Sequence, residues 1–557
     1  MADKMMVGDV VAEFLQQIGV TTAFGVISIH NIPMLDAIGR RNAIRFVPTR
    51  GEAGAGHMAD GFARVKGGLG VLFTSTGPGA ANATGALLEA HFASTPLLHI
   101  TGQTATPNLG RNQGAVHDPK DQFAMLQSVS KAAYRVKSAE SALGVLTRAA
   151  AEALTPPMGP VSVELPIDIQ RTMIPRPAGL ESLNLPVPPP PPGDPAMLDQ
   201  LADIIAGAKR PLLWTGNGAK RAGEAVARFV EMGIPLITSM NGRGIVPEDH
   251  PMSLGSLGNT PEVRELFPTL DLLIVGASKL RAHETADLSL PLPERRVQID
   301  VDPAAEGRTY TSDFFLCADV GLALDALADR LEGRLDIDRK LADDVAKAKH
   351  QATESLREFL GEYSCFPGDL REAMPRDALW VRDITLNNMT WGHRIFPVYG
   401  PRDSIYPVGA AIGPGMQLGI GAALAADGRK VVAMCGDGGF QLDLVEVWTA
   451  AQEKADVVFL VMNDNAYGVI GHIQDTMYEG RRFYDKLQVP ELEKIAELTG
   501  MPYVRVEKAQ DMGPAVAEML KVGGPSLVEV DMNAIGEFPR YFKPPPYVEK
   551  ENEEAAD

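Results

Sequence analysis

The sequence predicts an α/β protein of three domains, in which parallel sheets are flanked by helices. Its 557 residues exceed the usual size of one domain, so about three domains are expected. Short apolar segments alternate with helical stretches, a pattern typical of parallel sheets covered by helices. A run of prolines interrupts this alternation and indicates a boundary between two α/β units.

The N-terminal domain is expected over residues 1–178 and opens with an amphipathic helix. Residues 179–195 follow as a linker, because five consecutive prolines at 188–192 favour an extended, semi-rigid chain. The strands of this domain are predicted at 22–26, 44–48, 70–75, 96–101 and 161–165.

The central domain is expected over 196–335, with strands at 211–215, 272–276 and 297–301. Gly216-Asn217-Gly218 follows the first of these strands, but its glycines do not complete the G-x-G-x-x-G pattern of a dinucleotide site. A charged helical linker at 336–370 leads to the C-terminal domain at 371–545. An acidic tail at 546–557 ends the chain.

The C-terminal domain contains the most informative stretch. An apolar strand at 431–435 ends at Gly436-Asp437-Gly438-Gly439, and a second strand at 457–462 ends at Asn463-Asp464-Asn465. The carboxyl ends of neighbouring parallel strands are where such sheets bind ligands. Glycines allow backbone N–H groups to approach an anion, and aspartates offer hard oxygen ligands to Mg²⁺ or Ca²⁺. The pattern therefore predicts a site for a metal-bridged diphosphate.

Gly436-Asp437-Gly438 and Asn463, which follows Asp437 by 26 residues, resemble the thiamine diphosphate signature of the acetolactate synthase, 2-oxo acid decarboxylase and benzaldehyde lyase superfamily. The resemblance implies first and third domains of one fold, which bind pyrimidine and diphosphate respectively, around a Rossmann-like central domain. The implied metal ligands are Asp437, the backbone carbonyl of Ala466 and Asp464, where the family usually has Asn. Further implied cofactor contacts are Gly436, Gly438, Gly439, Tyr467, Gly468, Val469 and Ile470.

In the N-terminal domain, Glu52 lies in a segment similar to the family's catalytic HEQGAGHMAEGYAR, with Gly51 in place of His. The family's glutamate hydrogen-bonds the aminopyrimidine of the cofactor, and this role is implied for Glu52. Residues 77–82 look like the family's GPGxxN turn, so Pro78, Gly79 and Asn82 are expected against the cofactor. Residues 411–419 resemble the segment that bends it, with Met416 as the apolar wedge and backbone groups near Pro414 on the aminopyrimidine.

Two histidines are candidates for contact with the substrate. His30 aligns with an active-site histidine of benzaldehyde lyase, and His117 falls where relatives place a substrate-pocket glutamine. Either imidazole could shuttle a proton or donate a hydrogen bond to a carbonyl or carboxylate. A purely structural or exposed position is the alternative for each. Val469 and Ile470 are expected as pocket walls over the thiazolium.

The resemblance implies thiamine diphosphate- and Mg²⁺-dependent cleavage or formation of a C–C bond on a 2-oxo acid, with pyruvate as the default substrate. One alternative is a benzaldehyde lyase-like enzyme that acts on aldehydes and 2-hydroxy ketones. Another is a catalytically silent cofactor-binding subunit. FAD is not supported, because residues 254–259 replace the Gly-Met-His-Gly-like stretch of flavin-binding relatives.

The bulk properties exclude several partners. A net charge of −19 with no basic stripe argues against nucleic acid and anionic membranes. No segment approaches the roughly 20 apolar residues of a membrane span. Three widely separated cysteines form no disulfide framework, so a reducing cytoplasm is expected. The resemblance implies a homodimer as the smallest active unit and favours a tetramer.

Overall fold

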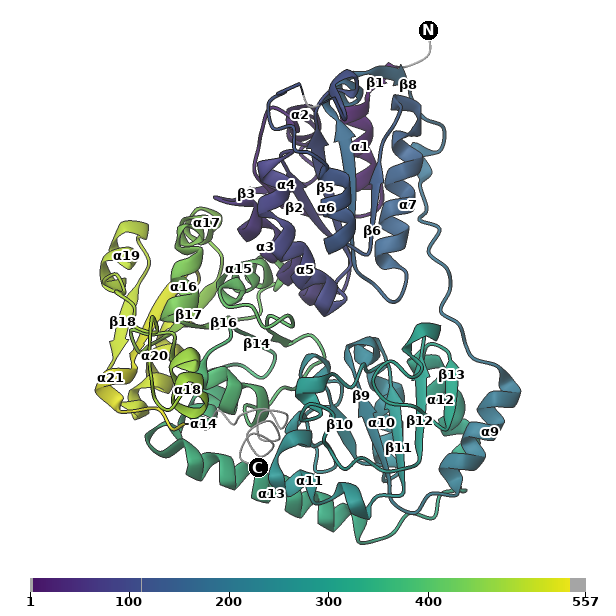
Figure 1. Ribbon diagram of the computed structural model, residues 1–557, viewed down its shortest axis with the longest axis vertical. Helices are drawn as coiled ribbons and strands as arrows, with labels where there is room; N and C mark the ends of the chain where they lie inside the picture. Colours follow the sequence, from purple (N-terminus) through teal and green to yellow (C-terminus); the bar gives the residue numbers. More distant parts are fainter. Residues whose placement is uncertain (1–3, 112, 541–557) are drawn as a thin grey trace, which may run out of the picture.

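The computed structural model describes residues 4–111 and 113–540 (Figure 1). In Figure 1 the N-terminal domain lies at the top in purple and blue, the central domain at the lower right in teal, and the C-terminal domain at the left in green and yellow. Each domain contains a parallel sheet flanked by helices, as the sequence predicts. The acidic tail expected at 546–557 lies outside the described residues.

The N-terminal and C-terminal domains share one topology, as the resemblance implied. Each contains a six-stranded parallel sheet, and the strands, numbered along each domain, lie in the order 2-1-3-4-6-5 in both. The N-terminal strands are β2 (Thr22–Gly25), β3 (Arg45–Pro48), β4 (Gly70–Thr74), β5 (Leu97–Gln103), β6 (Ala132–Arg135) and β7 (Pro160–Pro166). The C-terminal strands are β14 (Leu379–Arg382), β15 (Ser404–Ile405), β16 (Val431–Gly436), β17 (Val457–Asn463), β18 (Tyr503–Val506) and β19 (Ser526–Asp531).

Amphipathic or buried helices cover both faces of these two sheets (Figure 1). In the N-terminal domain they are α1 (Val7–Gln17), α2 (Ile32–Arg41), α3 (Glu52–Lys66), α4 (Pro78–Asn82), α5 (Thr84–Ala93), α6 (Gln122–Val129) and α7 (Ala142–Leu154). In the C-terminal domain they are α14 (Phe366–Ala373), α15 (Pro414–Ala425), α16 (Asp437–Leu442), α17 (Val447–Glu453), α18 (Gly468–Met477), α19 (Leu492–Thr499) and α20 (Met512–Met519).

The central domain is a five-stranded parallel sheet with strand order 2-1-3-4-5, as expected of a Rossmann-like fold. The proline-rich stretch reaches it without helix or strand over residues 183–194, and Pro191 O accepts a hydrogen bond of 2.8 Å from Asp319 N. The long helix α13 (Leu341–Leu360) then leads along the bottom of Figure 1 to the C-terminal domain. The strands are β9 (Pro211–Thr215), β10 (Leu236–Thr238), β11 (Leu272–Gly276), β12 (Arg296–Asp300) and β13 (Phe314–Cys317).

Helices α3 and α15 join the N-terminal and C-terminal domains through a shared buried core. Glycines let the two backbones approach closely. A Cβ at Gly61 of α3 would overlap Leu418 O, and a Cβ at Gly421 of α15 would overlap Met58 O. The packing brings the N-terminus of each helix close to the other domain, and both termini carry residues expected at the cofactor.

Within 4–111 and 113–540, no helix is both long and apolar enough to cross a lipid bilayer.

Candidate active site

A cavity of about 390 Å³ opens at the carboxyl edge of the C-terminal sheet. Its walls come from residues 384–532, including the ends of β16 and β17, where open parallel sheets bind ligands. Ten residues predicted to hold the cofactor line this cavity: Gly436, Asp437, Gly438, Gly439, Asp464, Ala466, Tyr467, Gly468, Val469 and Ile470.

Asp437 and Asp464 bring two carboxylates together in this cavity. Asp437 is 2% exposed, and its Oδ2 has no hydrogen-bond partner among the described residues. Burial, and then the negative charge of Asp464, raise the pKa of Asp437 to about 7. Burial also raises the pKa of Asp464, whose Oδ1 accepts a hydrogen bond of 3.2 Å from Ala466 N. A buried and a half-buried carboxylate side by side, with one oxygen unpartnered, fit a divalent cation.

Backbone groups must complete the coordination of such a cation. Across the described ranges, no cluster of three or more His, Cys, Asp and Glu side chains could hold a metal ion. Ala466, whose carbonyl is the predicted third ligand, lines the same cavity as Asp437 and Asp464. The residues present therefore fit the predicted donor set, in which two carboxylates and one carbonyl leave further positions to phosphate oxygens or water.

The rest of the cavity wall suits an anion. Helix α18 begins there at Gly468, so its first backbone N–H groups lie at the wall without partners inside the helix. A Cβ at Gly438 would lie 2.7 Å from the Tyr467 ring, which explains the glycine at that position. No Lys or Arg is among the residues that line the cavity. A bound diphosphate would therefore be neutralised by a cation rather than by basic side chains.

The structure corrects the predicted wedge. Met416 lies in the first turn of α15 at 0% exposure, inside the core shared with α3, and neither it nor Pro414 lines the cavity. Ile412 and Ala410 line the cavity instead, and Ile412 is 40% exposed. The prediction failed because it placed the apolar residue inside the helix, whereas the loop that precedes α15 faces the cavity.

Two buried carboxylates fix this loop. Glu89 of α5, in the N-terminal domain, accepts hydrogen bonds from Val408 N at 2.6 Å and Gly409 N at 2.8 Å. Asp383, at the end of β14, accepts one from Gly413 N at 2.7 Å. Burial raises the pKa of both carboxyl groups, and that of Asp383 to about 7. The loop is therefore held at both ends, by two different domains.

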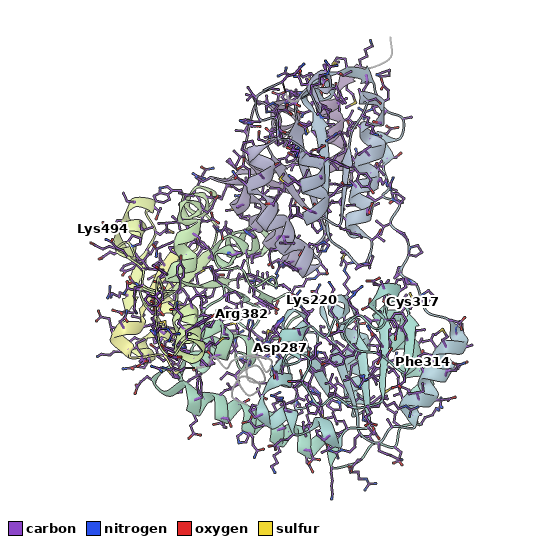
Figure 2. The ribbon with its side chains drawn as sticks, in the orientation of Figure 1. Lys220, Asp287, Phe314, Cys317, Arg382 and Lys494 are labelled. Carbon is purple, nitrogen blue, oxygen red and sulfur yellow. The ribbon has the colours of Figure 1, made fainter. Side chains whose placement is uncertain are left out.

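The end of β14 is itself anchored by Arg382, which Figure 2 labels in the C-terminal domain. Its guanidinium is fully buried and donates to Asn388 Oδ1 at 2.9 Å and Ser404 Oγ at 2.8 Å. Burial lowers the pKa of Arg382 to about 9. These contacts hold the end of β14, and Asp383, the next residue, accepts from the loop.

The N-terminal domain gathers the second set of predicted residues. Asn82 Nδ2 donates to Glu52 Oε2 at 3.2 Å, and a Cβ at Gly79 would lie 2.7 Å from Glu52 Oε1. Glu52 is the first residue of α3, and Pro78 is the first residue of α4. The predicted glutamate and the GPGxxN turn thus form one cluster.

The two candidate histidines lie beside this cluster. The rings of His30 and His117 are 5.4 Å apart between centroids, and His117 Nδ1 is 3.3 Å from Ser75 Oγ. His30 is 6% exposed, and its Nδ1 has no partner among the described residues. Burial, then the neighbouring charge of His117, lower the pKa of His30, which favours the neutral imidazole. Neither histidine, nor Glu52, lines the cavity of the same chain.

A further buried carboxylate, that of Glu446, was not predicted from the sequence. Glu446, which ends a short helical turn at Leu444–Glu446, is 1% exposed and accepts from Gly51 N at 2.9 Å, directly before Glu52. Its partner lies 395 positions earlier in the chain, so no local pattern could have indicated the contact. The glutamate reads as an ordinary first-turn residue of a helix.

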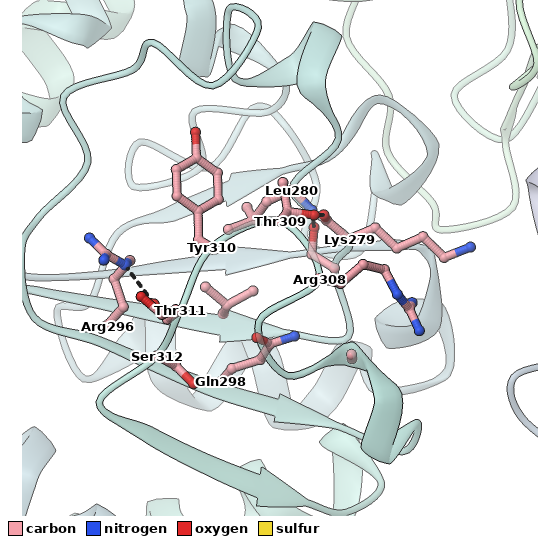
Figure 3. Close-up of a pocket in the computed structure, with 12 residues that line it drawn as sticks. Lys279, Leu280, Arg296, Gln298, Arg308, Thr309, Tyr310, Thr311 and Ser312 are labelled. Atoms are coloured by element: carbon pink, nitrogen blue, oxygen red, sulfur yellow. Dashed lines mark hydrogen bonds between the residues drawn. The ribbon is translucent and has the colours of Figure 1, made fainter.

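The central domain contains a separate small cavity (Figure 3). Arg296 Nε donates to Thr311 O at 3.0 Å along its wall, which Figure 3 marks with a dashed line. The Arg296 guanidinium carbon lies 6.0 Å from the centre of the Tyr310 ring. The cavity holds about 20 Å³, which is room for a water molecule.

The chain is similar to known proteins over most of its length. It matches three family models: the N-terminal TPP binding domain of thiamine pyrophosphate enzymes at residues 5–125, their central domain at 198–327 and their C-terminal TPP binding domain at 383–530. A relative from Pseudomonas aeruginosa, named "Probable 2-ketoarginine decarboxylase AruI", is 31% identical over 84% of this chain and 83% of its own.

Plant proteins are similar over an even larger share of the chain. Acetolactate synthase 1 of Oryza sativa subsp. japonica and acetolactate synthase 2 of Zea mays, both chloroplastic, are each 29% identical over 94% of this chain and 84% of their own.

Proposed function

Because the chain belongs to the thiamine pyrophosphate enzymes, we propose that it is a 2-oxo acid decarboxylase or carboligase that holds thiamine diphosphate through Mg²⁺. One observation carries the mode of binding. The cavity at the end of the C-terminal sheet contains the buried carboxylate of Asp437, the half-buried carboxylate of Asp464 and no basic side chain, so an anion enters it only with a cation. Asp437, Asp464 and the Ala466 carbonyl would hold the Mg²⁺, and the start of α18 the diphosphate.

When bound, thiamine diphosphate supplies a nucleophilic carbon and an electron sink for cleavage of the bond beside a carbonyl. The chain contributes the rest. Glu52, hydrogen-bonded to Asn82, is the proton-holding group for the aminopyrimidine. Ile412 is the apolar wedge, and Val469 and Ile470 are apolar walls that exclude water from the reacting atoms.

His30 and His117 are proposed to face the substrate. A neutral His30 with an unpartnered ring nitrogen can donate or accept one hydrogen bond at a carbonyl or carboxylate. The relative named as a 2-ketoarginine decarboxylase supports a 2-oxo acid with a long side chain, and the acetolactate synthases support pyruvate. Both kinds of 2-oxo acid should therefore be tested first as substrates.

The smallest active unit is proposed to be a homodimer, which can pair into a tetramer. In one chain Glu52 and the exposed Pro78 and Asn82 stand apart from the cavity that contains Asp437. A second copy that lays its N-terminal cluster over this cavity would complete both sites.

The test is a proton NMR time course of the protein with thiamine diphosphate, Mg²⁺ and either pyruvate or 2-oxo-5-guanidinopentanoate. Loss of the 2-oxo acid with release of an aldehyde identifies a decarboxylase, and appearance of a 2-hydroxy ketone or acetolactate identifies a carboligase. The matched control is E52Q, which is expected to bind Mg²⁺ and cofactor but to turn over at least a hundredfold more slowly.

His30 also supports a second candidate, a benzaldehyde lyase-like enzyme that acts on 2-hydroxy ketones. Cleavage of benzoin to benzaldehyde, with both 2-oxo acids left intact, would replace the first proposal with this one. If cofactor binds but none of the three substrates reacts, the result favours the third alternative, a cofactor-binding subunit without catalytic activity.

A further inference from the structure

Glu446 connects the two halves of the candidate site within one chain. It belongs to the C-terminal domain and ends the segment that starts with Asp437, passes through α16 and leads into α17. Its side chain is 1% exposed and points to the N-terminal domain, where it meets the start of α3. The first residue of α3 is Glu52.

The contact is specific in its atoms. Glu446 Oε1 accepts hydrogen bonds from Gly51 N at 2.9 Å and Arg50 N at 3.1 Å, and its Oε2 accepts one from the Thr449 hydroxyl. A Cβ at Gly54 would overlap Glu446 Oε1. The glycine therefore leaves the space that the carboxylate occupies.

The start of α3 depends on this contact because it lacks a cap of its own. The N-cap is Gly51, and no side chain of the helix start accepts a hydrogen bond there. A carboxylate also interacts favourably with the positive end of a helix. Glu446 supplies the missing acceptor from another domain, at the two peptide groups that precede Glu52.

We propose that Glu446 is a positioning residue that fixes the backbone of Glu52 so that its carboxylate meets the aminopyrimidine. This inference rests on the proposed role of Glu52. In this proposal the C-terminal domain has two roles: it binds the metal and the diphosphate, and it fixes the position of Glu52 in the same chain.

Two readouts test this role separately from turnover. The first is hydrogen–deuterium exchange of the backbone amides of residues 50–54 in the cofactor-free protein. The second is the rate of deuterium exchange at the thiazolium C2 of bound cofactor, with no substrate present. Mg²⁺-dependent cofactor affinity is measured alongside, because Asp437 and Asp464 remain in every variant.

The variants are E446A, E446Q and G54A. Loss of the acceptor in E446A is expected to speed amide exchange at 50–54 and to slow C2 exchange about tenfold, with cofactor Kd changed less than about threefold. E446Q keeps one acceptor oxygen and is expected to stay within about threefold of the unaltered protein in both rates. G54A displaces the carboxylate from the opposite side and is expected to resemble E446A, so the test stands even where E446A does not fold.

The matched control is E453A. Glu453 lies on α17 and pairs with Arg45 at 2.6 Å, so it joins the same two domains without touching the start of α3. Its loss is expected to leave both exchange rates unchanged. Equal rates in E446A, G54A and E453A would overturn the positioning role. If E52Q leaves C2 exchange unchanged, the proposed function of Glu52 fails instead.

Discussion

Mixing two inactive variants tests whether the active site lies between two copies of the chain. E52Q removes the proton-holding carboxylate of the N-terminal cluster, and D437N removes a proposed metal ligand of the cavity. Each variant alone is expected to lack turnover. In a mixed dimer, one site combines intact Glu52 from the D437N chain with intact Asp437 from the E52Q chain, and the other site carries both changes.

The expected magnitude follows from this division of residues. If equal amounts of the two chains are unfolded and refolded together, half of the dimers are mixed, and each mixed dimer has one intact site of two. Activity should therefore return to about a quarter of that of the unaltered protein. The assay is the NMR time course with the substrate identified above, at fixed total protein concentration.

A control separates complementation from incomplete inactivation. Each variant refolded alone must stay inactive. When the double variant E52Q/D437N is refolded with the unaltered chain, each site of a mixed dimer carries one of the two changes, so only the dimers of two unaltered chains should be active. No recovery in the mixture of single variants, with mixed dimers demonstrated by mass spectrometry, would refute a site shared between chains.

Three further outcomes are expected. I412A should weaken thiamine diphosphate binding about tenfold, with little effect on the free energy of unfolding. M416A should lower the free energy of unfolding by about 2–5 kcal/mol and leave the cofactor affinity of the folded protein nearly unchanged. Calorimetric titration and urea unfolding distinguish the two variants, and the reverse pattern would restore Met416 as the wedge. The cofactor-free protein should lose stability as the pH rises from about 4 to about 7, because the pKa of Asp437 is about 7 in the folded chain and near its ordinary 3.8 in the unfolded one. D437N should flatten this part of a plot of melting temperature against pH, and Mg²⁺ with cofactor should also reduce the loss. A plot unaffected by D437N would contradict the raised pKa of Asp437. E89A should release the loop at Val408 and Gly409 and weaken cofactor binding about tenfold, and E89Q should bind more nearly like the unaltered protein. Equal cofactor affinities in E89A, E89Q and the unaltered protein would show that the loop does not need the hydrogen bonds to Glu89.

The sequence predicts the parts of the site that local chemistry defines. Gly436 to Gly439 and Asp464 are recognisable because turn glycines and acids directly follow apolar strands, and the structure brings them to one cavity. Glu52 and Asn82 lie 30 positions apart, and the resemblance implied a cofactor contact for each; the structure adds the hydrogen bond between them. Local patterns identify such residues because each belongs to a strand end or to a short glycine-containing turn or helix that follows a strand.

The residues that sequence reasoning missed or misplaced depend on packing between domains. Glu446 and Glu89 read as ordinary helix residues, and only the contact between the N-terminal and C-terminal domains reveals what they bind. Met416 and Ile412 are both apolar and four positions apart, so the choice between them required knowing where the loop ends and α15 begins. The strand predictions in the C-terminal domain also missed β14, β15, β18 and β19, and of these β15 has only two residues, too few to show a period.

The close contact of α3 with α15 joins two equivalent helices. Each helix connects the second strand of its domain to the third, so the two are counterparts in duplicate copies of one topology. Glu52 at the start of α3 and Ile412 just before α15 consequently occupy matching corners of the two copies. A single structural corner has thus acquired two chemistries: an acid in one copy and a hydrocarbon in the other. Added bulk at Gly61 or Gly421 would push the two helices apart, because a Cβ at either position would overlap a backbone oxygen of the other helix, and the corner at the start of each helix would move with it.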